Sequence, residues 1–255
     1  MLKMKMSIIT VSFNSGKTIE DTFNSVLNQT YTNIEYIIVD GLSKDKTIDI
    51  IKKYEPKFKN RMHWISEKDG GLYDAMNKGI QMATGDVIGI INSDDLFCDN
   101  YAIEKVMQIF KENESLDSVY ADLFYVAQND TSKIVRRWIT GRQKQFKYGW
   151  HPAHPTLYIK KEVYNKYGLF NLNYKLAADF EIMLRFLERY RISTYYLQEA
   201  FVKMRLGGAT NKSFRNIYNQ NIECLKAFRL NGLKVNFLLY PFFRIVPKLF
   251  QFKNE

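Results

Sequence analysis

Cysteine is scarce in this chain, which has two copies in 255 residues. Cys98 and Cys224 form no CxxC pair, and two cysteines are too few for the disulfide framework of a small secreted domain. We therefore expect the protein to work in a reducing compartment, the cytoplasm.

Long apolar runs are also missing. No stretch approaches the ~18 uninterrupted apolar residues that a membrane-spanning helix needs. Lys3 and Lys5 precede the apolar residues 6–13, but no small-residue cleavage site follows. The sequence therefore predicts a first β-strand over this run rather than a signal peptide.

The glycine patterns of common nucleotide-binding loops are absent. Ser15-Gly16-Lys17-Thr18 resembles the end of a P-loop, but that motif needs glycine where the chain has Val11. No GxGxxG fingerprint follows the first predicted strand. These absences argue against a P-loop phosphate site and against a dinucleotide site of the usual kind.

Positive charge is in excess and lies mostly at one end. The formal net charge is +10, and residues 203–255 carry +8 of it, with ten Lys or Arg and two acidic residues. Residues 237–252 are also rich in aromatic side chains. Basic and aromatic residues together favour an anionic membrane surface over nucleic acid as the partner. The tail could instead pack on the catalytic domain, or on a second subunit as in a homodimer.

Apolar periodicity predicts alternating strands and helices in the first hundred residues. Strands are expected at residues 7–13, 34–39, 63–66 and 87–91, and helices at 19–27, 47–54 and 72–83. Gly85 is expected to cap the third of these helices. The alternation indicates an α/β fold with a Rossmann-like, mostly parallel central sheet flanked by helices.

After residue 97 the pattern changes. Strands are expected at residues 118–126 and 134–139, and helices at 103–110, 161–167, 179–190 and 212–230. Two successive strands favour an antiparallel or mixed extension of the sheet.

Polar side chains follow each of the four predicted parallel strands. Asn14 follows the first, Asp40 the second, Asp69 lies just beyond the third, and Asp94 and Asp95 follow the fourth. Open parallel sheets bind ligands beyond the carboxyl ends of their strands, so we expect these groups on one rim. Adjacent carboxylates repel each other, and Mg²⁺ or Mn²⁺ would relieve that repulsion. The pair therefore predicts a metal site, with a helix cap near residue 100 as the alternative.

Other candidates have structural alternatives of similar weight. Asp40 could meet a nucleotide base or ribose, or it could cap a turn, and Asp69 could bind a ligand, cap a helix, or both. Lys78 could contact phosphate or be a solvated surface lysine. Asp179 opens an amphipathic segment, where it would act as a helix N-cap or as a general base reaching over the cleft.

His151 and His154 flank Pro152 and Pro155 in a stiff loop. No third metal ligand is visible beside them in the sequence, so we do not expect a histidine metal site. Their functional alternative is to shape the acceptor side of the cleft.

In order and spacing, five segments of the chain resemble the family-2 nucleotide-sugar glycosyltransferases of the GT-A fold. The segments are residues 7–14, 36–41, 66–79, 84–95 and 178–185, and the resemblance covers roughly residues 5–210. The resemblance implies donor-binding roles for Thr10, Val11, Asn14, Asp40, Asp69, Lys78 and Ser93. It implies a metal at Asp94 and Asp95, and a catalytic base at Asp179. Gly207 and Gly208 would lie in a loop near the donor, on the acceptor side.

Two positions depart from that family's pattern. The metal motif often reads Asp-x-Asp, whereas this chain has Asn92 at the first position. Asn is a weaker, neutral ligand, so metal affinity is expected to be low before the donor binds. The base is often preceded by Glu and is here preceded by Ala178, which bears on acceptor contacts.

The resemblance implies an inverting, metal-dependent transferase. It would move a sugar from a nucleotide diphosphate donor, preferably a UDP-sugar, to a hydroxyl of a lipid-linked or saccharide acceptor in O-antigen, capsule or exopolysaccharide assembly. Residues 1–210 would form the catalytic domain, with a nucleotide-sugar half at 1–97 and an acceptor half at 98–210. Residues 211–255 would form a helix and a tail on the inner face of the cytoplasmic membrane.

Two alternatives remain at this point. A sugar-phosphate nucleotidyltransferase would also use a parallel sheet and a metal-binding carboxylate rim, but it usually needs an early glycine-rich loop with Arg and Lys. A non-catalytic nucleotide-sugar-binding protein would retain the sheet without the chemistry, and Asp179 argues weakly against it.

Overall fold

The computed structural model describes residues 4–207 and 214–249, with residues 214 and 245–249 described by their backbone alone. The strands are β1 (Met6–Ser12), β2 (Ile34–Asp40), β3 (Met62–Ser66), β4 (Val87–Ile90), β5 (Leu96–Phe97), β6 (Ser118–Ala127), β7 (Asp130–Trp138), β8 (Leu157–Lys160) and β9 (Thr194–Arg205). The α-helices are α1 (Ile19–Leu27), α2 (Thr47–Tyr54), α3 (Leu72–Met82), α4 (Ala102–Glu112), α5 (Lys161–Tyr167), α6 (Ala178–Met183), α7 (Phe214–Leu230) and α8 (Tyr240–Leu249). Shorter turns are η1 (Glu55–Phe58), η2 (Phe146–Tyr148), η3 (His154–Thr156) and the π-helical η4 (Leu184–Arg189).

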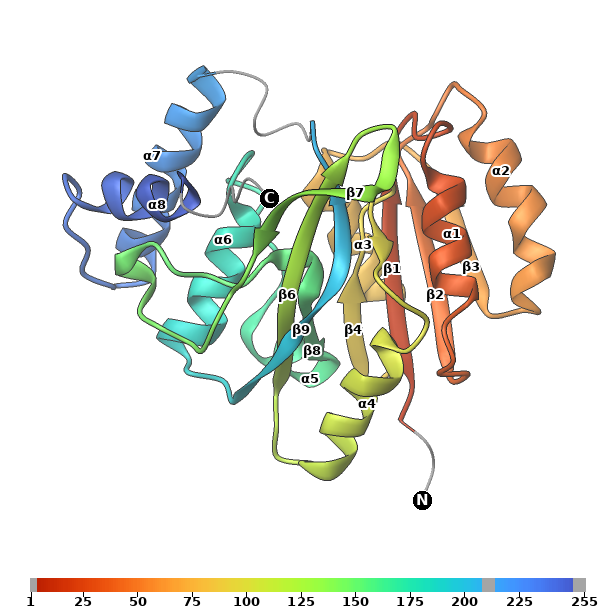
Figure 1. The fold of residues 1–255 in the computed structure, drawn as a ribbon, viewed down its shortest axis with the longest axis horizontal. Helices are drawn as coiled ribbons and strands as arrows, with labels where there is room; N and C mark the ends of the chain where they lie inside the picture. The colour runs from red at the N-terminus through yellow and green to blue at the C-terminus, as the bar shows by residue number, and fades with distance from the viewer. Residues whose placement is uncertain (1–3, 208–213, 250–255) are drawn as a thin grey trace.

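Four parallel strands in the order β3-β2-β1-β4 form the first part of the sheet (Figure 1). Ile9 of β1 lies beside Ile37 of β2 and Ile90 of β4. Helix α3 covers the face that carries Ile9, and α1, α2 and α4 cover the face that carries Ile8. Strands buried on both faces have nearly continuous apolar sequences, as β1 and β2 do. The expected Rossmann-like half is confirmed.

The second part of the same sheet is mixed. The order continues β8-β6-β9-β5, and β7 pairs with β6 in a hairpin. Strand β8 is antiparallel to β4 and β6, whereas β9 is parallel to β6. The expected mixed extension is therefore confirmed, and one continuous sheet underlies both halves of the chain.

One local expectation was confirmed only in part, and another was wrong. The helix expected over residues 179–190 is the short α6 followed by a π-helical turn, in which Tyr190 N donates to Arg185 O. Gly85 does not cap α3, which ends three residues earlier. Gly85 is needed for close packing instead, because an added Cβ would lie 2.5 Å from Ser7 Oγ.

Helices α7 and α8 lie at the end of the molecule opposite α1 and α2 (Figure 1). Cys224, Phe228 and Tyr240 are buried in the same core as α6, so part of residues 214–244 packs on the rest of the fold. Apolar side chains near the start of α8 remain exposed. Within residues 4–207 and 214–249, no helix is both long and apolar enough to cross a bilayer.

Candidate active site

Asp40 lies at the carboxyl end of β2, in register with Ser12 of β1 and Ser66 of β3. Ser12 Oγ donates to Asp40 Oδ1 over 3.0 Å, and Ser66 Oγ donates to Oδ2 over 2.8 Å. The amide and hydroxyl of Ser43 donate to the same carboxylate, which is fully buried. Asp40 therefore connects the segments that form this rim. Its contact with a nucleotide base stays a prediction. The base would have to replace one of these four hydrogen-bond donors.

Strand β1 does not present Thr10 and Val11 to the rim. Thr10 is fully buried and hydrogen-bonded inside the sheet, and Val11 is in the core. Their side chains are covered because β1 is buried on both faces up to that point, and the donor-binding roles expected for Thr10 and Val11 stay predictions.

Phe13 and Asn14 are the residues that the chain exposes just beyond β1. Phe13 is 65 % exposed and lies close to Gly41. An exposed aromatic face at this rim suits stacking on a nucleotide base. Asn14 adopts a φ of 51°, and it joins two loops because its N–H donates to Ser43 Oγ and its Oδ1 accepts from Lys44 N.

Asp69 lies beside the loop that follows β2. A Cβ added to Gly41 would come within 2.6 Å of Asp69 Oδ2, so that loop needs glycine. Asp69 Oδ1 accepts from Gly71 N over 2.9 Å, which closes a turn just before α3; the N-cap residue of α3 is Gly71, not Asp69. Lys78 Nζ pairs with Glu67 at 2.7 Å and with a carbonyl of the same loop, so it braces that loop. Ligand roles for Asp69 and Lys78 stay predictions.

The two carboxylates after β4 differ in their exposure. Asp95 is fully buried; Oδ2 accepts from Asn92 Nδ2 over 2.8 Å, and Oδ1 has no hydrogen-bond partner among the described residues. Asp94 is only partly buried. Burial raises the pKa of both carboxyl groups, and the charge of Asp94 raises the pKa of Asp95 further. A buried, unsatisfied carboxylate beside another is unfavourable without a compensating ligand.

This pair fits the chemistry of a divalent cation. Mg²⁺ and Mn²⁺ commonly take one or two carboxylates together with phosphate oxygens and waters. In the described parts of the chain, no group of three or more His, Cys, Asp or Glu could hold an ion. An ion would therefore depend on Asp94, Asp95 and the phosphates of a bound donor.

Arg205, at the end of β9, places a cation beside the carboxylate pair. It is 5 % exposed and donates to the carbonyl of Asp94 over 2.7 Å and to the carboxylate of Asp21. The positive charge of Arg205 lowers the pKa of both carboxyl groups, whereas burial raises it. Ser93 Oγ and Ser15 Oγ lie 2.7 Å apart, which ties this loop to the loop after β1.

Asp179 begins α6 at the same rim. Tyr73 Oη donates to its Oδ1 over 3.1 Å, and Phe180 N donates to the same oxygen over 2.8 Å. Both of these donors bond to Oδ1. Burial raises the pKa of Tyr125 on β6, and the charges of Asp95 and Asp179 raise it further. Tyr125 therefore lies within electrostatic range of both carboxylates.

His151 and His154 lie close to the start of α6. The His151 ring packs edge-on against Phe180 with 5.7 Å between centroids. Burial lowers the pKa of His154, which keeps this imidazole neutral at pH 7. Gly207 follows β9 with a φ of 107°, whereas Gly208 lies outside the described residues. Acceptor roles for these four residues stay predictions.

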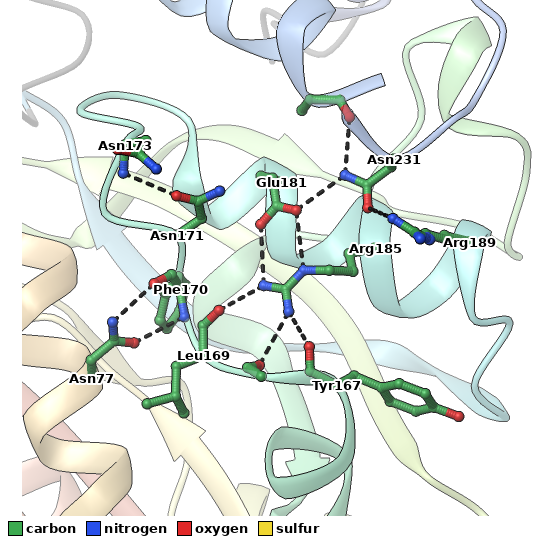
Figure 2. Close-up of polar contacts among 12 residues, drawn as sticks. Asn77, Tyr167, Leu169, Phe170, Asn171, Asn173, Glu181, Arg185, Arg189 and Asn231 are labelled. Carbon is green, nitrogen blue, oxygen red and sulfur yellow. Dashed lines mark hydrogen bonds and ion pairs between the residues drawn. The ribbon is translucent and has the colours of Figure 1, made fainter. Parts of the chain in front are cut away.

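Helix α7 holds α6 in place. The Glu223 carboxylate accepts hydrogen bonds from the amides of residues 175–177, the segment that leads directly into α6. Figure 2 shows Glu181 of α6 paired with Arg185, whose guanidinium also donates to carbonyls of the loop after α5. Asn231, just after α7, donates to Glu181 as well. The candidate base therefore sits on a braced helix.

Comparison with known proteins decides the family. Residues 7–176 match the model described as glycosyl transferase family 2. The chain belongs to this family. One relative of this family-2 transferase, a PGL/p-HBAD biosynthesis glycosyltransferase of Mycobacterium bovis, is 26 % identical over 207 residues, which cover 80 % of this chain and 78 % of the relative. A glycosyltransferase of Haemophilus influenzae is 25 % identical over 239 residues, covering 89 % and 72 %.

Solved structures share the fold of this family-2 transferase. S. aureus TarS in complex with UDP-GlcNAc matches with a TM-score of 0.72 at 18 % identity, over 94 % of this chain and 70 % of the TarS chain. The mannosyltransferase PcManGT from Pyrobaculum calidifontis, in complex with GDP-Man and Mn²⁺, matches with a TM-score of 0.65 at 13 % identity, over 94 % and 68 %. These likenesses establish the fold and confirm the expected GT-A class.

Sequence reasoning missed several residues of the transferase's rim. Phe13 could have been found, since an aromatic residue directly after a fully buried strand is expected to emerge at the sheet edge. Glu223 had a signal too, because it is the one acidic residue between positions 203 and 254. Tyr73 and Arg205 had none, since their partners are distant in sequence.

Proposed function

We propose that this chain transfers a sugar, with inversion, from a UDP-sugar to a hydroxyl of a lipid-linked saccharide in surface polysaccharide synthesis. The observation that supports this most is the meeting of carboxylates from separate segments at one rim. Asp94 and Asp95 follow β4, Asp179 begins α6, and Tyr125 lies within electrostatic range of two of them. TarS, which is similar in fold, was solved with UDP-GlcNAc.

The donor would lie over the ends of β1, β2 and β4. Phe13 would stack on the base, and Asp40 and Asp69 would accept hydrogen bonds from the base or ribose. Asn14 and Ser93 would keep the loops around the nucleotide in place through the bonds described above. In this proposal residues 1–210 carry the catalysis, and residues 211–255 support α6 and carry the membrane contact.

The diphosphate would lie beside Asp94 and Asp95. A divalent ion held there would offset the negative charge that grows on the leaving diphosphate. Asn92 is neutral and its side-chain amide already donates to Asp95 Oδ2, so the ion would depend on the two carboxylates of Asp94 and Asp95, including the unpaired Asp95 Oδ1. PcManGT, which is similar in fold, was solved with Mn²⁺.

Asp179 would act as the general base. Its Oδ2 takes the proton of the acceptor hydroxyl while that oxygen bonds to the anomeric carbon and the bond from this carbon to the diphosphate oxygen breaks. The products are one glycosidic bond and the nucleoside diphosphate. General-base catalysis contributes typically about 10²–10⁴-fold. Tyr73, by holding Oδ1, keeps the carboxylate oriented for this step.

Replacing the base tests this proposal directly. Asp179→Asn is nearly isosteric but cannot take a proton, so turnover should fall at least about 100-fold while donor affinity stays near normal. Release of nucleoside diphosphate from a panel of UDP- and GDP-sugars, with and without acceptor, measures this. Asp49→Asn, on an exposed face of α2, is the matched control.

Each other outcome has a meaning. Unchanged turnover in Asp179→Asn would remove this residue from the mechanism, and lost donor affinity would assign it a structural role. If the wild type binds nucleotide sugars but neither transfers nor hydrolyses any of them, the chain is a non-catalytic binder.

Peripheral membrane binding is the second part of the proposal. Four exposed side chains near the start of α8 form what we call the α8 patch: Phe237, Leu238, Leu239 and Phe242. Lys147 and Lys234 lie around a hollow beside it. Exposed aromatic and aliphatic groups next to basic ones suit an anionic bilayer surface, where a lipid-linked acceptor would be found.

Flotation with liposomes that contain anionic lipid tests the α8 patch. Leu238→Glu with Phe242→Glu should abolish flotation, and Tyr101→Glu, at an exposed aromatic site before α4, should not. Substitutions are preferable to truncation, because Tyr240 is part of the core. A wild type that never floats, and forms dimers that Phe242→Glu dissociates, would make the patch a subunit interface instead.

A further inference from the structure

Tyr125 of β6 lies at the same level of the sheet as the candidate metal ligands. Lys203 of β9 is in register with Leu96 of β5 on one side and with Phe124 of β6 on the other. Asp95 and Tyr125 are the next residues from these two positions, toward the same end of the sheet. Neighbouring strands are about 4.8 Å apart, so the backbones of Asp95 and Tyr125, two strands apart, are separated by roughly 10 Å.

A line of packed rings joins Tyr125 to the candidate base on its other side. Trp138 of β7 stacks on the Tyr125 ring with 6° between planes. The His151 ring packs edge-on against Trp138, with 5.2 Å between centroids, and edge-on against Phe180. The amide of Phe180 donates to Asp179. Tyr125 therefore lies between the carboxylate pair after β4 and the base on α6.

The charges of both carboxylates act on the Tyr125 phenol. Burial raises the pKa of this phenol, Arg136 lowers it, and the charges of Asp95 and Asp179 raise it further. Such interactions weaken with distance, so both carboxylates are near the phenol. With its pKa raised, Tyr125 stays protonated at pH 7. Its O–H is therefore available as a hydrogen-bond donor and does not act as a base.

Strand β7 holds the Tyr125 ring in place. Arg136 lies directly across from Tyr125 in the β6–β7 pair, and its guanidinium carbon is 4.7 Å from the centre of the ring. Trp138 is two residues farther along β7 and so on the same face. Tyr125 is half-buried, which leaves part of its surface open to a ligand. A ring that is already held loses little conformational entropy when its hydroxyl binds.

The proposed reaction defines what occupies the space beside this hydroxyl. The anomeric carbon of the donor is bonded to the diphosphate, which would lie beside Asp94 and Asp95. The acceptor oxygen that attacks this carbon would give its proton to Asp179. The transferred sugar must therefore lie between the carboxylate pair and the base. A site that hydrogen-bonds a hydroxyl of its substrate discriminates strongly against analogues that lack it.

We infer that Tyr125 binds the transferred sugar of the donor, with its O–H donating to one hydroxyl of that sugar. This inference rests on the proposed function, because it assigns a specificity-determining residue to the same site. Tyr125 and Phe13 then contact opposite ends of the donor, since Phe13 would stack on the base. Tyr125 therefore affects which sugar is transferred and does not affect which nucleotide carries it.

Binding of UDP and of UDP-sugars to Tyr125→Phe tests the contact. This substitution removes the hydroxyl and keeps the stacked ring. The probes are UDP, UDP-glucose, UDP-galactose and UDP-GlcNAc, each titrated by calorimetry with Mn²⁺ and without acceptor. The Kd of the preferred UDP-sugar should rise about threefold to tenfold, the loss of one hydrogen bond, while the Kd of UDP stays the same. Tyr195→Phe is the matched control, because Tyr195 is exposed and pairs with Val119 at the other end of β6.

Deoxy analogues separate a direct contact from an indirect one. Each analogue of the preferred UDP-sugar lacks one hydroxyl of the sugar. For the analogue that lacks the partner hydroxyl, wild type and Tyr125→Phe should have equal Kd, because neither complex contains the hydrogen bond. The other analogues should keep the difference. If every analogue keeps it, Tyr125 acts through Asp95 or Asp179, and the proposed contact is disproved.

Two further results would overturn the inference. One is an equal Kd of wild type and Tyr125→Phe for every UDP-sugar, and the other is an equal rise in Kd for UDP and for the UDP-sugars. Affinity of the wild type for the UDP-sugars tests the proposed function separately. If the wild type binds none of them, the proposed donor is wrong and the inference fails with it. If the wild type binds and hydrolyses them but Tyr125→Phe changes nothing, the inference alone fails.

Discussion

Two buried carboxylates lie at opposite ends of the parallel strands, and the protein treats them in opposite ways. Glu35, near the amino end of β2, is 3 % exposed and accepts hydrogen bonds from Lys5, Ser7 and Thr84. Burial alone would raise its pKa, but these donors outweigh burial and hold the pKa at about 2. Asp95, after β4, is equally buried, yet its Oδ1 has no described partner and its pKa is raised by burial and by its neighbour's charge.

The difference separates a structural carboxylate from one left for a ligand. At the amino end the chain supplies every donor that Glu35 needs, so burial of the charge stabilises the fold. At the carboxyl end it supplies Asn92 for one oxygen of Asp95 and leaves the other unpaired. Open α/β sheets bind ligands at this end. The unpaired charge of Asp95 is expected to lower the free energy of unfolding, and a bound cation is expected to raise it again.

The largest expected effect is a difference in activity between substitutions at the carboxyl end and at the amino end of the parallel strands. Asp94→Asn or Asp95→Asn should lower transfer about 10²–10³-fold, the usual size for losing electrostatic stabilisation of a transition state. Glu35→Gln should leave transfer per folded molecule near wild type, because it lies at the far end of the strands. Initial rates corrected for the folded fraction by circular dichroism measure this. Equal losses at both ends would remove the distinction.

The second effect separates the two ends by stability. Glu35→Gln should lower the free energy of unfolding by roughly 3 kcal/mol, the equivalent of the pKa shift of this carboxyl group. Asp95→Asn should leave it unchanged or raise it, since it removes a buried charge. Glu20→Gln, in an exposed pair with Lys53, is the control and should leave the free energy of unfolding nearly unchanged. Urea titrations of the four proteins decide the matter.

The third effect is in the pH dependence of stability. The folded pKa of Glu35 lies below its ordinary 4.5, so its contribution is present above that pH and is lost as the pH falls toward 2. Between about pH 5 and pH 3 the wild type should lose about 2 kcal/mol more than Glu35→Gln. For Asp95 the pH dependence of stability has the opposite sign. Its pKa is raised in the folded state, so protonation at low pH favours the folded state. Parallel pH profiles for wild type and both variants would contradict the assignment.

The sequence predicted the sheet well because strands buried on both faces leave a strong apolar signal, as β1 and β2 do. It predicted that Asp94 and Asp95 follow a parallel strand and that Asp179 lies near the start of a helix, while their roles in metal binding and catalysis stay predictions. It did not predict that Thr10 is buried and Phe13 exposed, because the apolar run continues through Phe13 whereas the strand, buried on both faces, ends at Ser12.

Contacts between distant segments were beyond the sequence. Glu223 of α7 caps the start of α6 across 46 to 48 positions of chain, and no local pattern encodes such a pairing. Arg136 of β7, Lys144 of a loop and Arg244 of α8 line one cavity, although they are far apart in the sequence. The tail was expected to bind a membrane or to pack on protein; Tyr240 packs, while Phe242 remains exposed.

The smallest effect tests whether a cation supplies what the carboxyl end lacks. At ten times its Kd, Mn²⁺ should stabilise the wild type by about 1.4 kcal/mol, a rise in Tm of roughly 3–6 °C. Asp95→Asn should lose this rise, because the charge that the ion neutralises is gone, whereas Glu35→Gln should keep all of it from a lower starting Tm. Added UDP should enlarge the rise beyond the sum of the separate effects, since its phosphates complete the coordination of an ion that has two candidate carboxylates here. Differential scanning fluorimetry with Mn²⁺, UDP and both, repeated with EDTA, measures all of these. A Tm that Mn²⁺ raises equally in wild type and Asp95→Asn would place the ion elsewhere on the molecule, and the unpaired oxygen of Asp95 would then need a different explanation.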